Sequence, residues 1–374
     1  MKTCMKTALL AVALTTGLAA AAQARDLRIA PGAPPAHPAN SHLYQGLAKY
    51  LPEESGGKLT GVILGPEVVG LRQMKDALQT ELADVGNLLP LYFPAELPSF
   101  ALAGELSLSG TDPHAMGAAL TEYTVTCVSC QAEQTKFGVV YLGSGSSDPY
   151  VLLTTKPVAS MADVKGLRLR SGGAPFSRWA ENFGAVPVSI GVGETFESMS
   201  QGTIDGSIAS VGDLLSFRLV ELVKQITVVP LGSYFSTSNF AVAKNTWSEL
   251  GADDRKALVR AANRANADFT QRWGYDFPVI ANKAAAEAGI KTVKAEAAFV
   301  DASKAFAAAD QGTAAKISAE RFAMSDAPKR IADFMALVAK WEKITAELNH
   351  DSKKVADRVW TDVWSKVDLA KYGN

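Results

Sequence analysis

The sequence predicts an α/β protein of two lobes, with a long helix that spans both lobes and extra C-terminal helices. Short apolar strands alternate with helix-period segments along most of the chain, a pattern typical of a mainly parallel sheet covered by helices. A glycine- and serine-rich linker, 143–149, divides this alternation in two. Of the 374 residues, the 350 that follow a targeting segment of 24 exceed what one hydrophobic core usually holds.

Residues 1–24 have the pattern of a cleavable export signal. Lys2 and Lys6 precede an apolar run at 7–21, and Ala22-Gln23-Ala24 supplies the small residues of a cleavage site. The run of 15 residues is shorter than the roughly 20 that span a bilayer. We therefore expect cleavage after Ala24 and a mature protein in a bacterial periplasm.

Composition and motifs exclude several classes of protein. Without the two lysines of the signal, 35 basic residues face 38 acidic ones, a net charge of −3. The chain thus lacks the basic surface that nucleic acid requires. The four histidines, at positions 37, 42, 114 and 350, form no metal-ligand spacing, and no dinucleotide or P-loop fingerprint is present. We expect no metal and no cofactor.

The first α/β unit is predicted from the spacing of its apolar residues. Alternation marks strands, and leucines at helical spacing mark the helix that follows a proline-rich loop at 31–38. In order, we expect a strand at 26–30, a helix at 41–54, a strand at 59–64, a helix at 69–82, a strand at 84–89, a helix at 113–133 and a strand at 137–142.

The second unit runs from the linker to about residue 233, and a strand at 236–242 returns toward the first. A long helix then starts at Asp253 and Asp254, whose charges suit the positive end of the helix dipole. Pro278 must interrupt it, because proline lacks the backbone donor and clashes with the preceding turn. Gly289 can end it, a strand follows at 290–293, and 297–371 is alanine-rich and helical. We assign 25–147 plus 238–275 to lobe I, and 148–237 plus 276–374 to lobe II.

Cys127 and Cys130 are the cysteines left after the signal, and an oxidising periplasm favours a disulfide between them. A redox enzyme would need this C-x-x-C motif at the start of a helix that follows a strand, whereas here it falls inside a predicted helix. Two thiols are too few for a zinc site. We expect a structural disulfide, with redox activity as the alternative.

Arg170 is the strongest candidate for a binding residue. It ends a short strand in which Leu167 and Leu169 face one way and Arg168 and Arg170 the other. A glycine-rich turn follows at 171–173, where a guanidinium can present its planar fork to a carboxylate. The alternative is that the two arginines form a solvated surface pair.

Residues 163–170 read D-V-K-G-L-R-L-R and match a D-x-K-G-x-[KR]-x-R strand at each fixed position. Further motifs follow in order: Gly184-Ala185-x-Pro187-Val188, Glu194-x-Phe196, Gly202-x-Ile204-Asp205-Gly206, Phe240-Ala241-Val242-Ala243 and Trp247-Ser248-Glu249-Leu250, with Ala83-Asp84-Val85 upstream. The whole resembles the DctP-like solute-binding proteins of tripartite ATP-independent periplasmic (TRAP) transporters, over residues 26–295. The resemblance implies a two-lobed periplasmic binding protein fold, Arg170 gripping a ligand carboxylate, and delivery to TRAP membrane subunits.

The sequence departs from members of that family that bind acidic sugars. Tyr150 stands where they carry a second ligand arginine, Val192 replaces an aromatic residue, and Ala209 and Ser210 stand near their asparagine. Ser210 is thus a candidate ligand residue, and Tyr150 could wall the cleft or pack in the core. With one guanidinium, the pocket favours a small monoanion or zwitterion, a carboxylate or a sulfonate, over a dicarboxylate or sialic acid.

Five further residues are weaker candidates, each with a structural alternative. Asn87 could donate from the first lobe or be a strand-end turn residue, and Tyr92 could wall the cleft or pack in the core. Phe176 and Trp179 could stack on an apolar or cationic ligand group or pack in the core. Asp213 could hold an ammonium group or cap a helix.

The sequence therefore predicts a receptor, not an enzyme, that captures a small organic acid between two lobes. The main alternative is an exported hydrolase with its active site between the lobes. Another is an interaction module whose alanine-rich C-terminal helices dock a partner. The same helices leave room for a homodimer.

Overall fold

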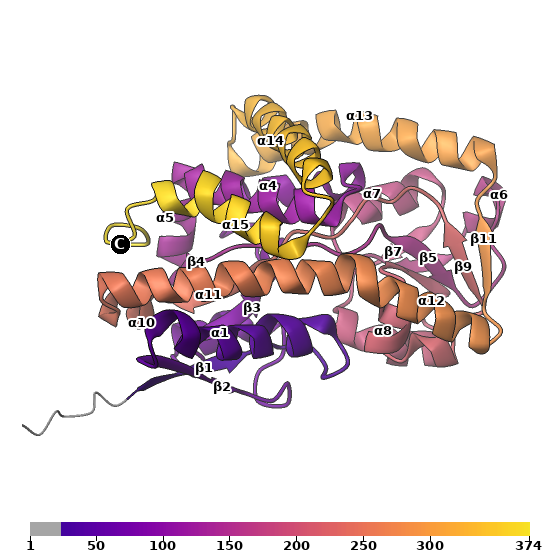
Figure 1. Cartoon of the computed structure of the whole chain (residues 1–374). Helices are drawn as coiled ribbons and strands as arrows, with labels where there is room; N and C mark the ends of the chain where they lie inside the picture. The colour runs from indigo at the N-terminus through magenta and orange to yellow at the C-terminus, as the bar shows by residue number, and fades with distance from the viewer. Residues whose placement is uncertain (1–23) are drawn as a thin grey trace, which may run out of the picture.

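A computed structural model describes residues 24–374 of the chain. It contains two mixed sheets flanked by helices, with one long helical rod running past both (Figure 1). This confirms the predicted α/β class. Within the described residues, no helix combines the length and the apolar character needed to cross a membrane. The export signal predicted at 1–24 falls almost entirely outside them and stays a prediction.

The first sheet has five strands in the order β2-β1-β3-β10-β4. β1 is parallel to β2 and β3, whereas β10 runs antiparallel to its neighbours β3 and β4. β10 returns to this sheet after the second one has been built, as its position in the sequence predicts. The strands are β1 (Arg25–Ala30), β2 (Leu59–Ile63), β3 (Val85–Leu88), β4 (Val139–Tyr141) and β10 (Ser238–Ala243).

The second sheet has six strands in the order β11-β9-β5-β8-β6-β7. β6 is parallel to β7 and β8, while β5 is antiparallel to β8 and β9. The strands are β5 (Val151–Thr154), β6 (Arg168–Arg170), β7 (Val186–Val188), β8 (Gly206–Ala209), β9 (Gln225–Val228) and β11 (Lys291–Lys294). Its short helices are α6 (Met161–Val164), α7 (Ala174–Asn182), α8 (Thr195–Ser200) and α9 (Asp213–Ser216).

Three helices around the first sheet differ from the predicted bounds. The helix predicted at 41–54 begins with a π-helical turn, Ala39–Tyr44, before α1 (Gln45–Ser55). The helix predicted at 69–82 shrinks to α2 (Met74–Gln79), because turns occupy the segment around Gly70. The single helix predicted at 113–133 is two, α4 (Pro113–Thr126) and α5 (Val128–Phe137), since Cys127 adopts an extended conformation between them. A further helix, α3 (Pro98–Gly104), precedes them.

The long helical rod follows β10 and the short helix α10 (Lys244–Glu249). α11 (Ala252–Gln271) carries Asp253 and Asp254 in its first turn and leads through a π-helical turn, Arg272–Asp276, into α12 (Phe277–Glu287). The interruption expected from Pro278 is confirmed, since the α-helical ladder resumes with proline in its first turn. α11 packs on α1, and α12 packs on α9, so the rod touches both units.

Three C-terminal helices complete the molecule: α13 (Ala297–Phe322), α14 (Ala327–Glu347) and α15 (Ser352–Asp362). α13 contacts α7 and α3, whereas α14 packs on α4 and α15 packs on α11 and α4 (Figure 1). The helices predicted within lobe II thus lie largely against elements predicted within lobe I. The lobe boundaries themselves stay a prediction.

Two groups of buried apolar residues form the core. The larger one joins the first sheet, the C-terminal helices and one face of the second sheet. The smaller one lies between the other face of the second sheet and helices α8, α9 and α12. The second sheet therefore packs against apolar residues on both faces, and one of these faces shares its core with the first sheet.

Candidate ligand-binding site

A cavity of about 60 Å³ lies where residues of both sheets and the long rod meet. About half of the residues that line it lie at or after the carboxyl ends of β1, β3, β6 and β8, the place where ligands bind in open α/β sheets. The lining residues are Ala33, His37, Leu71, Asn87, Leu89, Tyr92, Tyr150, Arg170, Gly172, Val192, Asp213, Phe217, Tyr234, Thr237, Asn239, Phe269 and Trp273.

Arg170 is only 3% exposed and lines this cavity. Its Nε donates to the carbonyl oxygen of Ile190 at 3.4 Å, and within residues 24–374 its guanidinium forms no ion pair with a carboxylate. The neighbouring Arg168 is about half exposed and pairs with Asp205 at 2.9 Å. The two arginines are therefore not a solvated pair. Gly172 makes room for the guanidinium, because a Cβ there would lie 3.3 Å from Arg170 Nη1.

Asp213 brings the opposite charge to the cavity. It is 5% exposed, lies in the first turn of α9, and its carboxylate accepts no hydrogen bond from any described residue. Burial raises the pKa of Asp213 to about 7, although the positive charge of Arg170 opposes this shift. The helix-cap alternative is not observed. The site thus holds a fixed positive charge and a carboxyl group that titrates near neutral pH.

Aromatic rings form the apolar wall of the cavity. Tyr150 stacks on Tyr234 with 6.1 Å between ring centroids, and Phe269 stacks on Trp273 with 5.0 Å. His37 lies 5.4 Å from the Trp273 ring. Burial lowers the pKa of His37 to about 4, and its Nδ1 accepts from the backbone of Ala39. The imidazole is therefore neutral at physiological pH and acts as part of the wall.

Two buried polar atoms of the lining lack a partner among the described residues. Asn87, at the end of β3, leaves its Oδ1 without a donor, and Trp273 leaves its Nε1 without an acceptor. Asn239, by contrast, donates from its side chain to Asn266. Because buried polar groups are usually hydrogen-bonded, these two atoms indicate where a ligand would contribute its own donor and acceptor.

Three residues predicted as ligand contacts do not line the cavity. Trp179 is fully buried between Phe183 and Phe299, and its Nε1 donates to Ser303. Phe176 lies behind the wall, with its ring 5.1 Å from that of Tyr150. Ser210 donates instead to the buried carboxylate of Asp148. The core-packing alternative thus describes both aromatic residues. Ser210 lies outside the cavity lining, and its contact with a ligand stays a prediction.

Several residues of the wall were not predicted from the sequence, chiefly Phe217, Tyr234, Phe269 and Trp273. Phe269 and Trp273 are part of the apolar stripe of the long helix, which has the same spacing as a stripe buried in the core. No local signal separates the two roles. Tyr234 and Phe217 lie in connections whose position depends on the fold of the second sheet.

The mouth of the cavity is bordered by residues of both units. An adjoining groove of about 300 Å³ shares Leu71, Tyr92, Val192 and Phe217 with the cavity. Across it, Arg72 Nε lies 3.2 Å from Glu194 Oε1, and both side chains are more than half exposed. This pair links the segment before α2 to the turn before α8. Tyr92 thus lies at the entrance of the cavity. This position is consistent with the predicted role of Tyr92 as part of the cleft wall.

The disulfide between Cys127 and Cys130 is present, as predicted. Its setting differs from the prediction, because Cys127 is the N-cap of α5 and the motif therefore begins a helix. Within residues 24–374, no group of three or more histidine, cysteine or acidic side chains could hold a metal ion.

Comparison with known proteins places this geometry in a family. The family described as bacterial extracellular solute-binding protein, family 7 (DctP), matches residues 30–311. The chain belongs to this family. A curated relative, a solute-binding protein of Albidiferax ferrireducens, is 30% identical over 105 residues, which are 28% of this chain and 31% of the relative. The chain thus matches less than a third of the length of that relative.

Solved structures share the fold over much more of the chain. A TRAP periplasmic solute-binding protein from Bordetella bronchiseptica, with bound (R)- and (S)-mandelate, is 25% identical, with a TM-score of 0.74 over 84% of this chain and 99% of that chain. A TRAP solute-binding protein from Rhodoferax ferrireducens, in complex with benzoate, is 20% identical, with a TM-score of 0.75 over 86% and 99%. The fold is that of TRAP solute-binding receptors, as the sequence motifs imply.

Proposed function

We propose that this family member is the extracytoplasmic receptor of a TRAP transporter and captures a small organic anion in the cavity between its two sheets. The observation that carries the proposal is the buried guanidinium of Arg170. A buried charge without a direct ion pair costs several kcal/mol, and Asp213, the acidic residue of the same cavity, interacts with Arg170 through its charge but forms no ion pair with it. An anionic ligand would supply that direct pair, in the bidentate geometry that suits the planar fork.

The lining supports a narrower class of ligand. One guanidinium matches one carboxylate, and the stacked rings of Tyr150 and Tyr234 suit a flat or branched apolar group. Asp213 and Asn87 could accept a hydroxyl or ammonium hydrogen from the same ligand. The cavity of about 60 Å³ has room for roughly four to six water molecules, at about 10–15 Å³ each. The site therefore suits a small monocarboxylate, such as the mandelate bound by the Bordetella protein.

Capture requires the two units to approach each other. The proposed ligand contacts come from both sheets and from the rod. Binding therefore favours the closed arrangement over an open one by the difference between the ligand's affinities for the two. Closure also removes water and strengthens the pair between Arg170 and the carboxylate. The Arg72–Glu194 pair spans the mouth between the two units in this arrangement.

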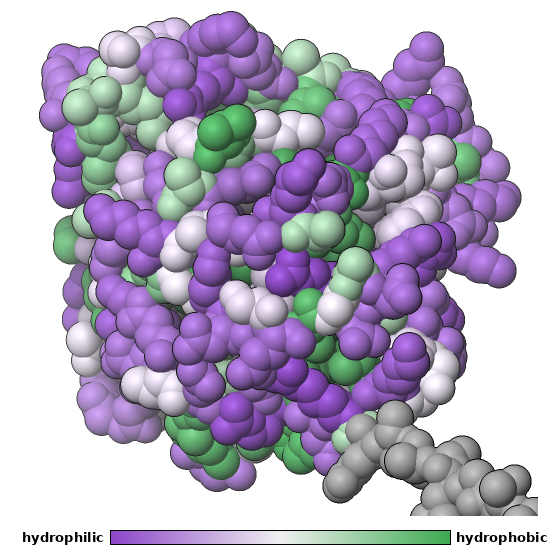
Figure 2. All heavy atoms as spheres, turned by 90° about the vertical axis from the view of Figure 1, so that its left-hand side faces the viewer, coloured by the Kyte–Doolittle hydropathy of each residue, from purple (hydrophilic) through white to green (hydrophobic). Residues whose placement is uncertain are grey.

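TRAP membrane subunits are the proposed partners, with the periplasm as the proposed location. Figure 2 shows the end of the molecule where α5, α10 and the C-terminus lie. Hydrophilic side chains cover most of this face, and the apolar ones form small separate groups. This face therefore offers little support for a homodimer, which stays a prediction.

A ligand screen tests the proposal. The mature protein would be titrated with mandelate, benzoate, lactate, succinate and benzenesulfonate while its melting temperature is followed. We expect stabilisation by monocarboxylates, confirmed by calorimetry, and recovery of the added compound unchanged after incubation. Conversion of an added ester or amide into product would instead support the exported hydrolase. Failure of every anion to bind would contradict the receptor.

A further inference from the structure

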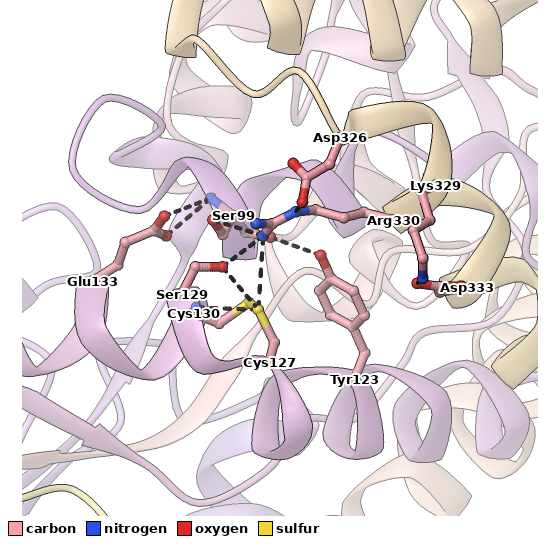
Figure 3. Close-up of polar contacts among 10 residues, drawn as sticks. All are labelled: Ser99, Tyr123, Cys127, Ser129, Cys130, Glu133, Asp326, Lys329, Arg330 and Asp333. Carbon is pink, nitrogen blue, oxygen red and sulfur yellow. Dashed lines mark hydrogen bonds and ion pairs between the residues drawn. A yellow bond between two sulfur atoms is a disulfide. The ribbon is translucent and has the colours of Figure 1, made fainter.

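The Cys127–Cys130 disulfide lies at an open groove on the side of the molecule formed by α4, α5 and α14 (Figure 3). The groove has a volume of about 650 Å³, and Cys127, Ser129 and Arg330 line it. Cys127 is partly exposed, and its neighbour Val128 is 83% exposed, whereas Cys130 is fully buried. A partner molecule can therefore reach one sulfur of the pair and not the other.

Two features would stabilise a thiolate at Cys127. The first is its place as N-cap of α5, where the backbone N–H of Cys130 points at Cys127 Sγ at 3.1 Å. The positive end of a helix dipole favours an anion there. The second is Arg330, whose Nη1 lies 4.0 Å from Cys127 Sγ and 2.6 Å from Ser129 Oγ. Low thiol pKa values in C-x-x-C motifs arise from surroundings of this kind.

The other charged groups near the disulfide are already engaged (Figure 3). Asp326 accepts from Arg330 Nε at 2.8 Å, and Glu133 accepts from the backbone of Ser99. Lys329 pairs with Asp333 further along α14. Tyr123, on α4, is the remaining titratable group, and burial raises its pKa to about 12, so that it stays neutral. Arg330 is therefore the charge that acts most directly on Cys127.

A purely structural role accounts poorly for this disulfide. The two cysteines are three positions apart, and a cross-link that closes so short a loop removes little conformational entropy from the unfolded chain. It joins a helix cap to the first turn of the same helix and ties no distant segments together. Its exposure to a groove beside an arginine is the feature that calls for another explanation.

We propose that Cys127–Cys130 is a thiol–disulfide exchange site for the dithiol of an exported protein. A thiolate of the partner attacks Cys127 Sγ, the disulfide breaks, and its electron pair passes to Cys130 Sγ, which takes up a proton. The second thiolate of the partner then attacks the partner's own sulfur in the mixed disulfide and releases Cys127 as a thiolate beside Arg330. The partner dithiol loses two electrons and becomes a disulfide, and the receptor gains two cysteine thiols.

Reduction of the folded protein is the first test. The oxidised mature chain would be treated with dithiothreitol without denaturant, and free thiols would be counted by mass after alkylation. We expect complete reduction at a rate proportional to the dithiothreitol concentration. A rate that is independent of concentration, or reduction only in denaturant, would overturn the proposal, because the disulfide would then react only after unfolding.

The second test concerns Arg330. In a Cys130→Ala background, the rate of Cys127 alkylation against pH gives the thiol pKa, which we expect below the ordinary value of about 8.5. Arg330→Gln should raise that pKa by about one unit and slow alkylation near neutral pH about tenfold. Lys329→Gln removes a charge from the same turn of α14 without touching sulfur and should change neither. An identical alkylation profile with and without Arg330 would refute its role.

Discussion

Replacement of Arg170 by methionine removes the guanidinium and keeps an unbranched side chain that can fill the same space. The loss of one partner from a buried charge pair costs about 2–5 kcal/mol of binding energy. Since each 1.4 kcal/mol is a factor of ten, the dissociation constant should rise by roughly 30- to 4,000-fold. Titration calorimetry with the best ligand of the screen would measure the change.

The stability of the ligand-free protein should respond in the opposite sense. Arg170 makes one long hydrogen bond to Ile190 and pairs with no described carboxylate, so its removal takes away a buried charge that the protein itself compensates poorly. We expect an unchanged or higher melting temperature for Arg170→Met without ligand. Added ligand, which stabilises the unmodified protein by mass action, should no longer raise the melting temperature of the variant.

Arg168→Met is the matched control. This arginine stands two positions earlier on β6, does not line the cavity, and pairs with Asp205. Its replacement should leave the dissociation constant unchanged. If Arg170→Met binds ligand within about threefold of the unmodified protein, or if both variants lose binding equally, the assignment of Arg170 as the anchor is refuted.

Three further variants examine the rest of the site. Between pH 3.8 and about 7, folded Asp213 holds a proton that the unfolded chain has released, so its contribution to stability falls as pH rises through that window. Asp213→Asn should therefore lose less stability than the unmodified protein between pH 5 and 7.5 in urea denaturation, and an equal loss would contradict the raised pKa. Asn87→Ala should weaken ligand binding about 3- to 10-fold in calorimetry, because the ligand's donor loses the buried side-chain oxygen that accepts from it; an unchanged dissociation constant would remove Asn87 from the site. Trp179→Ala should cost about 3–5 kcal/mol of unfolding free energy and leave ligand affinity at low temperature intact, whereas a selective loss of affinity would return Trp179 to the site.

The candidate site was only partly predictable from the sequence. Arg170 could be found because one short strand, its alternation and the following glycine turn are contiguous and give its direction. Asn87 lies near the end of the strand predicted at 84–89, and Asp213 follows the motif that ends at Gly206, so both could be named as candidates. The aromatic wall could not be found in this way. Trp179 and Trp273 both lie on helices and are both buried, and only one of them lines the cavity.

The sequence by itself determined the α/β class, the return of β10 to the first sheet, the interruption before Pro278 and the pairing of Cys127 with Cys130. These features depend on residue periodicity, on proline chemistry and on motifs within short stretches of chain. The tertiary structure decided which buried ring faces the cavity, that α14 and α15 cover the first unit, and that Arg330 stands beside Cys127. Those outcomes depend on contacts between segments that lie about two hundred residues apart in the sequence. The periodicity of apolar residues predicts that a side chain is buried, but it does not specify which distant segment covers that side chain.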